Sequence, residues 1–154
     1  MSGVHLHVSS GYSARYGGSL PADLVRRAVE RVGILALTDR DTVAGTVRFA
    51  AVAADVRPAF GVEVAVAPYT PPGLAPRRRT PVRGGAHVVE AEYRITLLAR
   101  NRAGWARLCR IVSAAHTAPV GGVPVVGWPV MEEYLAGEDL VLLGPVSEPV
   151  RALS

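Results

Sequence analysis

Three short polar motifs each lie on, or at the end of, a short apolar run of this 154-residue chain. They are His5-Leu6-His7, Thr38-Asp39-Arg40 and Gly61-Val62-Glu63. The runs are rich in valine, isoleucine, leucine and alanine, which is typical of strands buried on both faces of a parallel sheet. In a repeating βα layout the carboxyl ends of the strands gather at one edge, where such folds place their chemistry. The sequence therefore predicts an α/β fold with a site at that edge.

The residue types in these motifs suit a metal. His5 and His7 stand at positions i and i+2 of the first expected strand, so their side chains point the same way. Two imidazoles with a carboxylate such as Glu63 are suitable ligands for a transition metal. Without further context, the histidines are equally consistent with a surface or core pair, and Glu63 with a solvated carboxylate at a strand end.

Hydrophobic periodicity predicts alternating strands and helices along the chain. The expected strands are residues 4–8, 34–38, 58–67, 88–99 and 140–143. The first expected helix has Ser19 as its N-cap and ends at Gly33. The second begins at Asp41 or Thr42, and further helices cover 101–116 and 129–136.

Residues 68–86 carry five prolines and the run Arg77-Arg78-Arg79. A segment of this composition cannot bury enough apolar surface to order itself, so we expect a flexible loop. A solvated insertion is the simpler interpretation of its arginines, and contact with phosphates is the alternative.

Composition narrows the function classes. The net charge is +4, and every one of the 17 basic residues is arginine, which by itself is a weak sign of nucleic-acid binding. The single cysteine, Cys109, excludes an internal disulfide and a CxxC motif. No signal peptide and no apolar stretch long enough to span a bilayer is apparent, so the sequence predicts a cytoplasmic protein with no membrane partner.

Taken in order, the HxH, the Thr-Asp pair with its following residue, and the G-x-E resemble a PHP domain. More narrowly, ALTDRDTVAGTVRFA, FGVEVAV and ITLLARNRAGWARLCRIVSAAH resemble the amino-terminal PHP domain of bacterial C-family DNA polymerases. Arg40 points to the error-prone alpha-subunit branch. The resemblance spans residues 1–154 apart from the Pro/Arg-rich loop. It implies a distorted (β/α)7 barrel, of which this chain encodes roughly the first half.

In that family a metal cluster lies at the carboxyl-end mouth of the barrel. The resemblance implies that His5 and His7 match the first ligand pair and that Glu63 matches the acidic ligand. Asp39 matches the aspartate of the second motif and would line the site. The later ligands and the polymerase carboxylates would lie beyond residue 154.

Three positions depart from the family pattern. Arg40 stands where active members carry a ligating histidine, Tyr16 replaces an acidic or histidine ligand, and Arg94 stands where relatives often carry a histidine. A guanidinium stays protonated and has no lone pair for a metal. We therefore expect Arg40 to line the site, to pair with Glu63 or Asp39, and to replace the metal. If a metal is retained, zinc or manganese is expected.

The sequence thus favours a structural or interaction module, the PHP portion of an error-prone DNA polymerase III alpha subunit with a degenerate metal site. Its expected partners are the remainder of a C-family polymerase and, through the full-length enzyme, DNA during damage-induced lesion bypass. The alternatives are a stand-alone, metal-dependent phosphoesterase of the PHP type and a non-functional truncated gene product. Whether this chain is itself an enzyme stays open from sequence alone.

Overall fold

The computed structural model describes residues 3–67, 94–117, 119 and 123–143. Strands and helices alternate over most of this part, as the sequence predicts. The strands are β1 (Gly3–Val8), β2 (Val32–Arg40), β3 (Arg57–Ala67), β4 (Arg94–Ala99), β5 (Val126–Gly127) and β6 (Leu140–Leu143). The helices are α1 (Pro21–Ala28), α2 (Thr46–Val52), the 3-10 turn η1 (Ala53–Asp55), α3 (Arg102–Thr117) and α4 (Trp128–Leu135).

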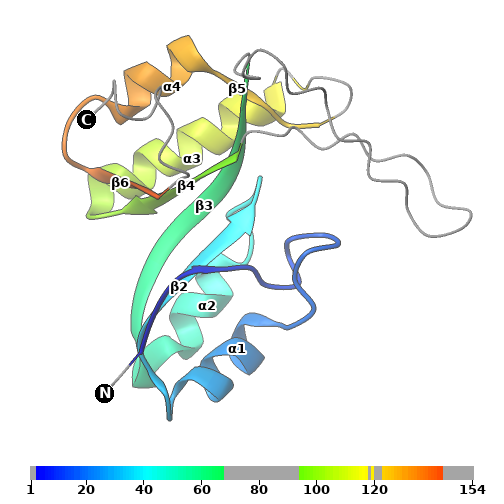
Figure 1. Ribbon diagram of the computed structural model, residues 1–154, viewed down its shortest axis with the longest axis vertical. Helices are drawn as coiled ribbons and strands as arrows, with labels where there is room; N and C mark the ends of the chain where they lie inside the picture. Colours follow the sequence, from blue (N-terminus) through cyan, green and yellow to red (C-terminus); the bar gives the residue numbers. More distant parts are fainter. Residues whose placement is uncertain (1–2, 68–93, 118, 120–122, 144–154) are drawn as a thin grey trace, which may run out of the picture.

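The strands form one curled sheet in the order β1-β2-β3-β4-β6, and β5 pairs with the far end of β3 (Figure 1). The expected α/β half-barrel is confirmed. Strands β1, β2 and β3 are parallel, but β4 is antiparallel to β3 and β6 is antiparallel to β4. The sheet is therefore mixed, and only β1, β2 and β3 have the parallel arrangement that their apolar runs suggest. Ala65 of β3 lies opposite Arg94 of β4, so the start of β4 lies beside the last part of β3, as in an antiparallel pair.

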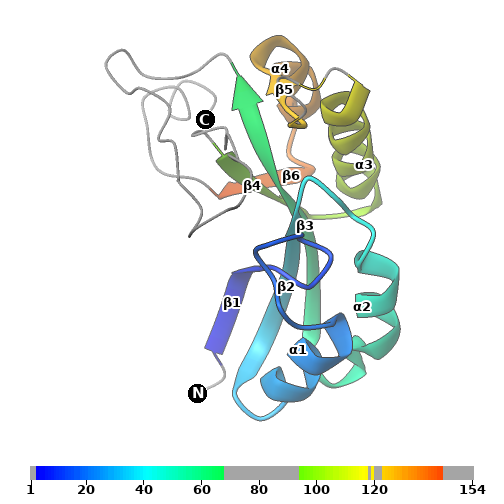
Figure 2. The same ribbon diagram turned by 90° about the vertical axis from the view of Figure 1, so that its right-hand side faces the viewer.

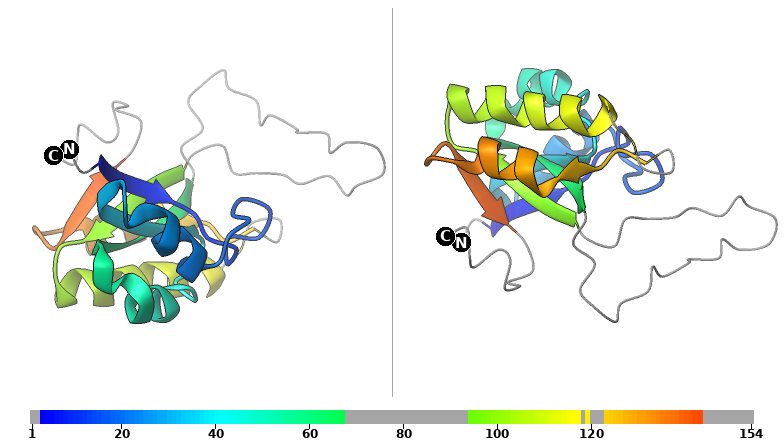
Figure 3. Two further views of the ribbon diagram at one scale, coloured as in Figure 1. Left: turned by 90° about the horizontal axis from the view of Figure 1, so that it is seen from below. Right: turned by 90° about the horizontal axis from the view of Figure 1, so that it is seen from above.

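Helices α2 and α3 lie on the same side of β3, as Figure 2 shows. Two clusters of buried apolar residues lie beneath the helices, and the views along the long axis in Figure 3 show the layers end on. The first cluster lies under α1 and α2 and consists of Val25, Ala28, Leu35, Leu37, Phe49, Ala53 and Val56. The second lies under α3 and α4 and consists of Val62, Val64, Val66, Ile95, Leu97, Leu108, Ile111, Ala115, Val126, Trp128 and Met131.

The first helix differs from the sequence prediction at its two ends. Leu20, not Ser19, is the N-cap residue, and its side chain makes no capping hydrogen bond. Pro21 starts the helix because its fixed φ suits the first turn and its missing N–H would have had no partner there. The helix ends at Ala28, and Gly33 belongs to β2 because that strand extends back to Val32, which lies opposite the start of β1.

The second helix begins later than predicted, at Thr46. Asp41 has a φ of 55°, which lies in the left-handed region and is incompatible with a first helical turn. The Thr42 hydroxyl accepts a hydrogen bond from the Ala44 amide, which holds a turn before the helix. Gly45 is the N-cap residue.

Two predicted features lie outside the described residues: the loop 68–86 with its run of arginines, and the part of the expected strand 88–99 that precedes Arg94. The short strand β5 was not predicted, since two residues carry no periodic signal. Within the described segments, every helix is too short or too polar to cross a membrane.

Candidate functional site

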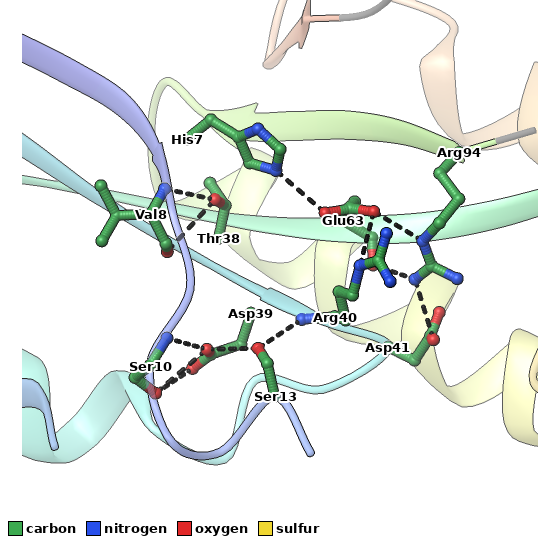
Figure 4. Close-up of polar contacts among 10 residues, drawn as sticks. All are labelled: His7, Val8, Ser10, Ser13, Thr38, Asp39, Arg40, Asp41, Glu63 and Arg94. Atoms are coloured by element: carbon green, nitrogen blue, oxygen red, sulfur yellow. Dashed lines mark hydrogen bonds and ion pairs between the residues drawn. The ribbon is translucent and has the colours of Figure 1, made fainter. Parts of the chain in front are cut away.

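Thr38, Asp39 and Arg40 follow one another at the end of β2, and their side chains contact three different parts of the protein (Figure 4). Thr38 Oγ1 accepts a hydrogen bond from the Val8 amide at 3.0 Å and donates to the Val8 carbonyl at 3.3 Å. The register of β1 with β2 shifts between His5 and Val8, and the Thr38 side chain there bonds the Val8 backbone in place of a backbone partner. Thr38 therefore fixes the end of β1 against β2, close to His7.

Asp39 is buried, and its carboxylate is held by the loop that follows β1. Oδ1 accepts hydrogen bonds from the Ser10 amide at 2.6 Å and from the Ser13 hydroxyl at 2.6 Å. Oδ2 accepts from the Ser10 hydroxyl at 2.8 Å. The Ser13 hydroxyl in turn accepts from the Arg40 amide at 2.9 Å. Asp39 thus holds the loop in place through hydrogen bonds from Ser10 and Ser13. Among the described residues it forms no ion pair.

Gly45 packs closely against the Asp39 side chain. A Cβ at this position would come within 2.8 Å of Asp39 Oδ2 and 2.9 Å of Tyr12 Cδ2. A side chain here would displace the aspartate or the loop, so a glycine is needed before α2.

Glu63 is the centre of the second polar cluster. Its Oε2 accepts a hydrogen bond from His7 Nε2 at 2.9 Å. Its Oε1 accepts from Arg40 Nε at 2.9 Å and from Arg94 Nε at 2.6 Å (Figure 4). The three donors come from β1, β2 and β4, so one carboxylate on β3 links four strands. We call His7, Arg40, Glu63 and Arg94 the Glu63 cluster.

Arg94 is held at two further points. Its Nη2 donates to the Glu63 backbone carbonyl at 3.1 Å and pairs with Asp41 Oδ2 at 2.8 Å. Asp41 is placed by its own amide, which donates to the Glu63 carbonyl, and its carbonyl accepts a hydrogen bond from His116 Nε2 at 2.6 Å. The carboxyl end of α3 is thereby tied to the loop after β2.

Arg40 lies with its guanidinium carbon 3.4 Å from the centre of the Tyr16 ring, a cation–π arrangement. Burial lowers the pKa of Arg40, and the nearby Arg94 lowers it further, while Glu63 acts in the opposite direction. A guanidinium remains protonated across such changes. Tyr16 and Arg40, two departures from the family pattern, are therefore in direct contact.

The pKa of Glu63 is lowered in the folded protein. Burial acts to raise it, but the hydrogen bond from His7 and the charges of Arg94 and Arg40 outweigh burial. Because the folded state holds the carboxylate ionised more firmly than the unfolded chain does, the resulting stability is present above the unfolded pKa. It is lost as pH falls through the lower, folded pKa.

We predict a pH dependence of stability that a Glu63→Gln variant lacks. The gap in free energy of unfolding between wild type and the variant should narrow as pH falls from 7 to below about 4.3, the ordinary pKa of glutamate. Urea unfolding followed by circular dichroism at several pH values measures the gap. An Asp55→Asn variant, changed at an exposed acid, serves as the control. A gap that widens towards low pH would contradict the lowered pKa of Glu63.

The structure brings together some of the predicted site residues and not others. His7, Glu63 and Arg40 meet in one cluster. His5 is exposed and, among the described residues, has no hydrogen bond or ion pair, so the two imidazoles do not share a partner. Asp39 lies at the neighbouring position of the same strand end but faces the loop.

Sequence reasoning missed the serines that hold Asp39, and it missed Asp41 and His116. The polar loop that follows the first strand is the signal that could have pointed to Ser10 and Ser13. The role of His116 has no local signal, because its partner is a backbone carbonyl 75 positions away in the chain.

Comparison with known proteins identifies the family. Residues 5–148 match the PHP domain family. This chain belongs to the PHP domain family. It is 38% identical over 146 residues to an error-prone DNA polymerase of Mycobacterium bovis, covering 92% of this chain and 12% of that protein. It is 30% identical over 142 residues to the DNA polymerase III subunit alpha of Deinococcus radiodurans, covering 87% of this chain and 10% of that protein. The PHP domain here thus spans about a tenth of the length of these curated relatives.

Among solved structures, the PHP domain is similar to an amidohydrolase from Chromobacterium violaceum, with a TM-score of 0.49 and 26% identity. That alignment covers 75% of this chain and 34% of the other chain.

The PHP resemblance implies a metal cluster, and the residues present do not fit one. Both oxygens of Glu63 already accept hydrogen bonds from cationic or imidazole groups, and two guanidinium groups occupy the space beside it. A metal ion there would lie next to fixed positive charge. Across the described residues, no group of three or more His, Cys, Asp or Glu side chains is arranged to hold a metal.

Proposed function

We propose that this chain is a structural and interaction module of an error-prone DNA polymerase alpha subunit, in which the Glu63 cluster replaces the metal cluster of active PHP domains. The polymerase body that follows such a domain in the longer relatives would be its partner, and DNA would be met only through the full-length enzyme. The 38% identity over 92% of this chain supports the assignment to that branch. The chemistry of lesion bypass would then belong to the polymerase body, and the module would act in the cytoplasm.

One observation carries the proposal: Arg40 and Arg94 both donate to Glu63 Oε1, at 2.9 and 2.6 Å. The two arginines supply the positive charge that metal ions would otherwise bring to this carboxylate. Unlike a metal ion, a guanidinium cannot lower the pKa of a bound water or accept a lone pair from a leaving oxygen. The cluster can therefore hold four strands together, but it lacks the groups for phosphoester hydrolysis.

Metal content and phosphatase activity test the proposal. After dialysis against zinc or manganese and then metal-free buffer, we expect elemental analysis of the purified chain to find well below one ion per chain. We expect no hydrolysis of p-nitrophenyl phosphate above the buffer blank with either metal added. An Arg40→His, Arg94→His double variant restores ligand types beside Glu63 and should retain more metal than wild type.

Two results would speak for the phosphoesterase alternative instead. One is a stoichiometric metal in the wild-type protein. The other is phosphatase activity that disappears in a Glu63→Gln variant. The DNA that follows codon 154 tests the partner: an in-frame or neighbouring region encoding a C-family polymerase body supports the proposal, and its absence counts against it.

A further inference from the structure

A groove of about 910 Å³ lies between α2 and α3, at the beginnings of β2 and β3. The groove and the Glu63 cluster lie on opposite faces of the sheet. Successive residues of a strand point to opposite faces, and Phe60, which lines the groove, is three positions before Glu63 on β3. Figure 2 shows the two flanking helices on the right-hand side of β3, with α3 above α2.

The floor of the groove is aromatic. The Phe60 ring lies edge-on to the buried Phe49 of α2, with 5.9 Å between ring centres, and edge-on to Trp105 of α3 at 6.3 Å. Phe60 and Trp105 both line the groove and are only partly buried. On the α2 side the wall includes Val47, which is 78% exposed. The floor therefore offers apolar side chains that a partner could cover.

The rim of the groove is positively charged. Arg57, Arg100 and Arg102 line it, all three are exposed, and the lining contains no acidic residue. Among the described residues none of the three forms an ion pair, although the Arg100 guanidinium donates to the Glu138 backbone carbonyl at 3.4 Å. The carboxylate of the neighbouring Asp139 is paired with Arg107. A partner of matching charge would therefore carry carboxylates beside its apolar side chains.

The form of the groove favours a polypeptide over a small molecule. Sites for small ligands enclose most of the ligand surface, whereas Val47 and the three arginines stand open to solvent. Two helices flanking an apolar floor suit a third helix laid between them. The edge strands of the described sheet are β1 and β6, whereas the groove lies over the central strand β3. An occupant would therefore pack on the face of the sheet, and the arginine rim favours one that carries carboxylates.

We propose that this groove binds an acidic amphipathic helix of a separate polypeptide. The apolar side chains of the helix would contact Phe60, Trp105 and Val47, and its carboxylates would meet Arg57, Arg100 and Arg102. The proposal does not depend on the state of the Glu63 cluster, since the two sites lie on opposite faces of the sheet.

A pair of fluorescently labelled peptides of about 14 residues, each with leucines at helical spacing, provides the probe. In one peptide the remaining positions are mostly glutamate, and in the other they are lysine. Fluorescence anisotropy with the intact 154-residue chain is expected to show binding of the glutamate peptide alone, weakening as salt is raised.

Position 47 offers matched variants of opposite charge. Val47 is exposed on α2, so Val47→Glu and Val47→Arg both remove an apolar contact at little cost to folding. Val47→Arg should bind the glutamate peptide at least about tenfold more tightly than Val47→Glu. Trp105→Ala should weaken binding about tenfold or more, as truncating a central aromatic residue does.

A second pair of double variants tests whether the arginines at the rim of the groove contribute to binding. Arg57→Gln with Arg102→Gln should weaken binding several-fold, whereas Arg15→Gln with Arg27→Gln, which removes the same charge away from the groove, should not. Equal binding of the two peptides, no binding of either, or equal affinities of the two position-47 variants would overturn the proposal. So would self-association of the chain that Val47→Glu abolishes, since a second copy would then be the occupant.

Discussion

Replacing Asp39 with alanine is expected to lower the free energy of unfolding by about 3 kcal/mol or more. The Asp39 carboxylate is buried and accepts from the Ser10 amide, the Ser10 hydroxyl and the Ser13 hydroxyl. Alanine would leave these donors without their acceptor beside the closely packed Gly45. Urea unfolding at pH 7 followed by circular dichroism measures the loss.

An exposed acid provides the control for Asp39. Asp55→Ala makes the same change in charge at an exposed position and should alter stability by no more than about 0.5 kcal/mol. The loop should also open locally in Asp39→Ala, so trypsin should cut after the exposed Arg15 faster than in wild type. An Asp39→Ala protein as stable as Asp55→Ala would show that the loop is held by other contacts.

The partner of Arg40 shows where sequence reasoning stops. From the sequence alone, Asp39 and Glu63 were both candidates. On a strand, neighbouring residues point to opposite faces, so Arg40 cannot share the environment of Asp39. The register of β2 and β3 places Arg40 opposite Glu63. That register follows from how two separate strands align in the folded sheet, which no local pattern in the chain specifies.

Strands β2 and β6 were predictable because each contains an uninterrupted apolar run. Strand β6 has the predicted bounds, Leu140–Leu143, and α3 differs from its prediction by one residue at each end. The direction of β4 was not predictable, because a buried strand carries the same apolar pattern in parallel and antiparallel sheets. The start of α2 was missed for a local reason, the left-handed conformation of Asp41, which serves its ion pair with Arg94.

The pairing of β4 with β3 also depends on Gly61, and the sequence alone does not reveal this role. A Cβ on Gly61 would lie 2.4 Å from the Leu97 carbonyl oxygen. The glycine of the G-x-E motif therefore allows β4 to pair with β3, and this pairing brings Arg94 to Glu63. The motif thus has a structural role in addition to its carboxylate.

Replacing Glu63 with glutamine is expected to lower the free energy of unfolding by about 2–3 kcal/mol at pH 7. The change keeps the shape of the side chain but leaves Arg40 and Arg94 facing each other without the shared carboxylate. These side chains are only 19% and 13% exposed, so water screens their repulsion poorly. Asp41 still pairs with Arg94, which keeps the loss below that of an isolated buried charge.

Removing Arg40 should lower the free energy of unfolding by less than removing the Glu63 carboxylate does. In Arg40→Gln, Glu63 keeps Arg94 at 2.6 Å and His7 at 2.9 Å, so no charge is left unpaired, and we expect a loss of about 1 kcal/mol. A double-mutant cycle of Arg40→Gln and Glu63→Gln should show the double variant to be less destabilised than the sum of the two single variants. Urea unfolding of the four proteins gives the coupling. If the losses simply add, or if Arg40→Gln costs more than Glu63→Gln, the carboxylate is not the common partner that holds the four strands together.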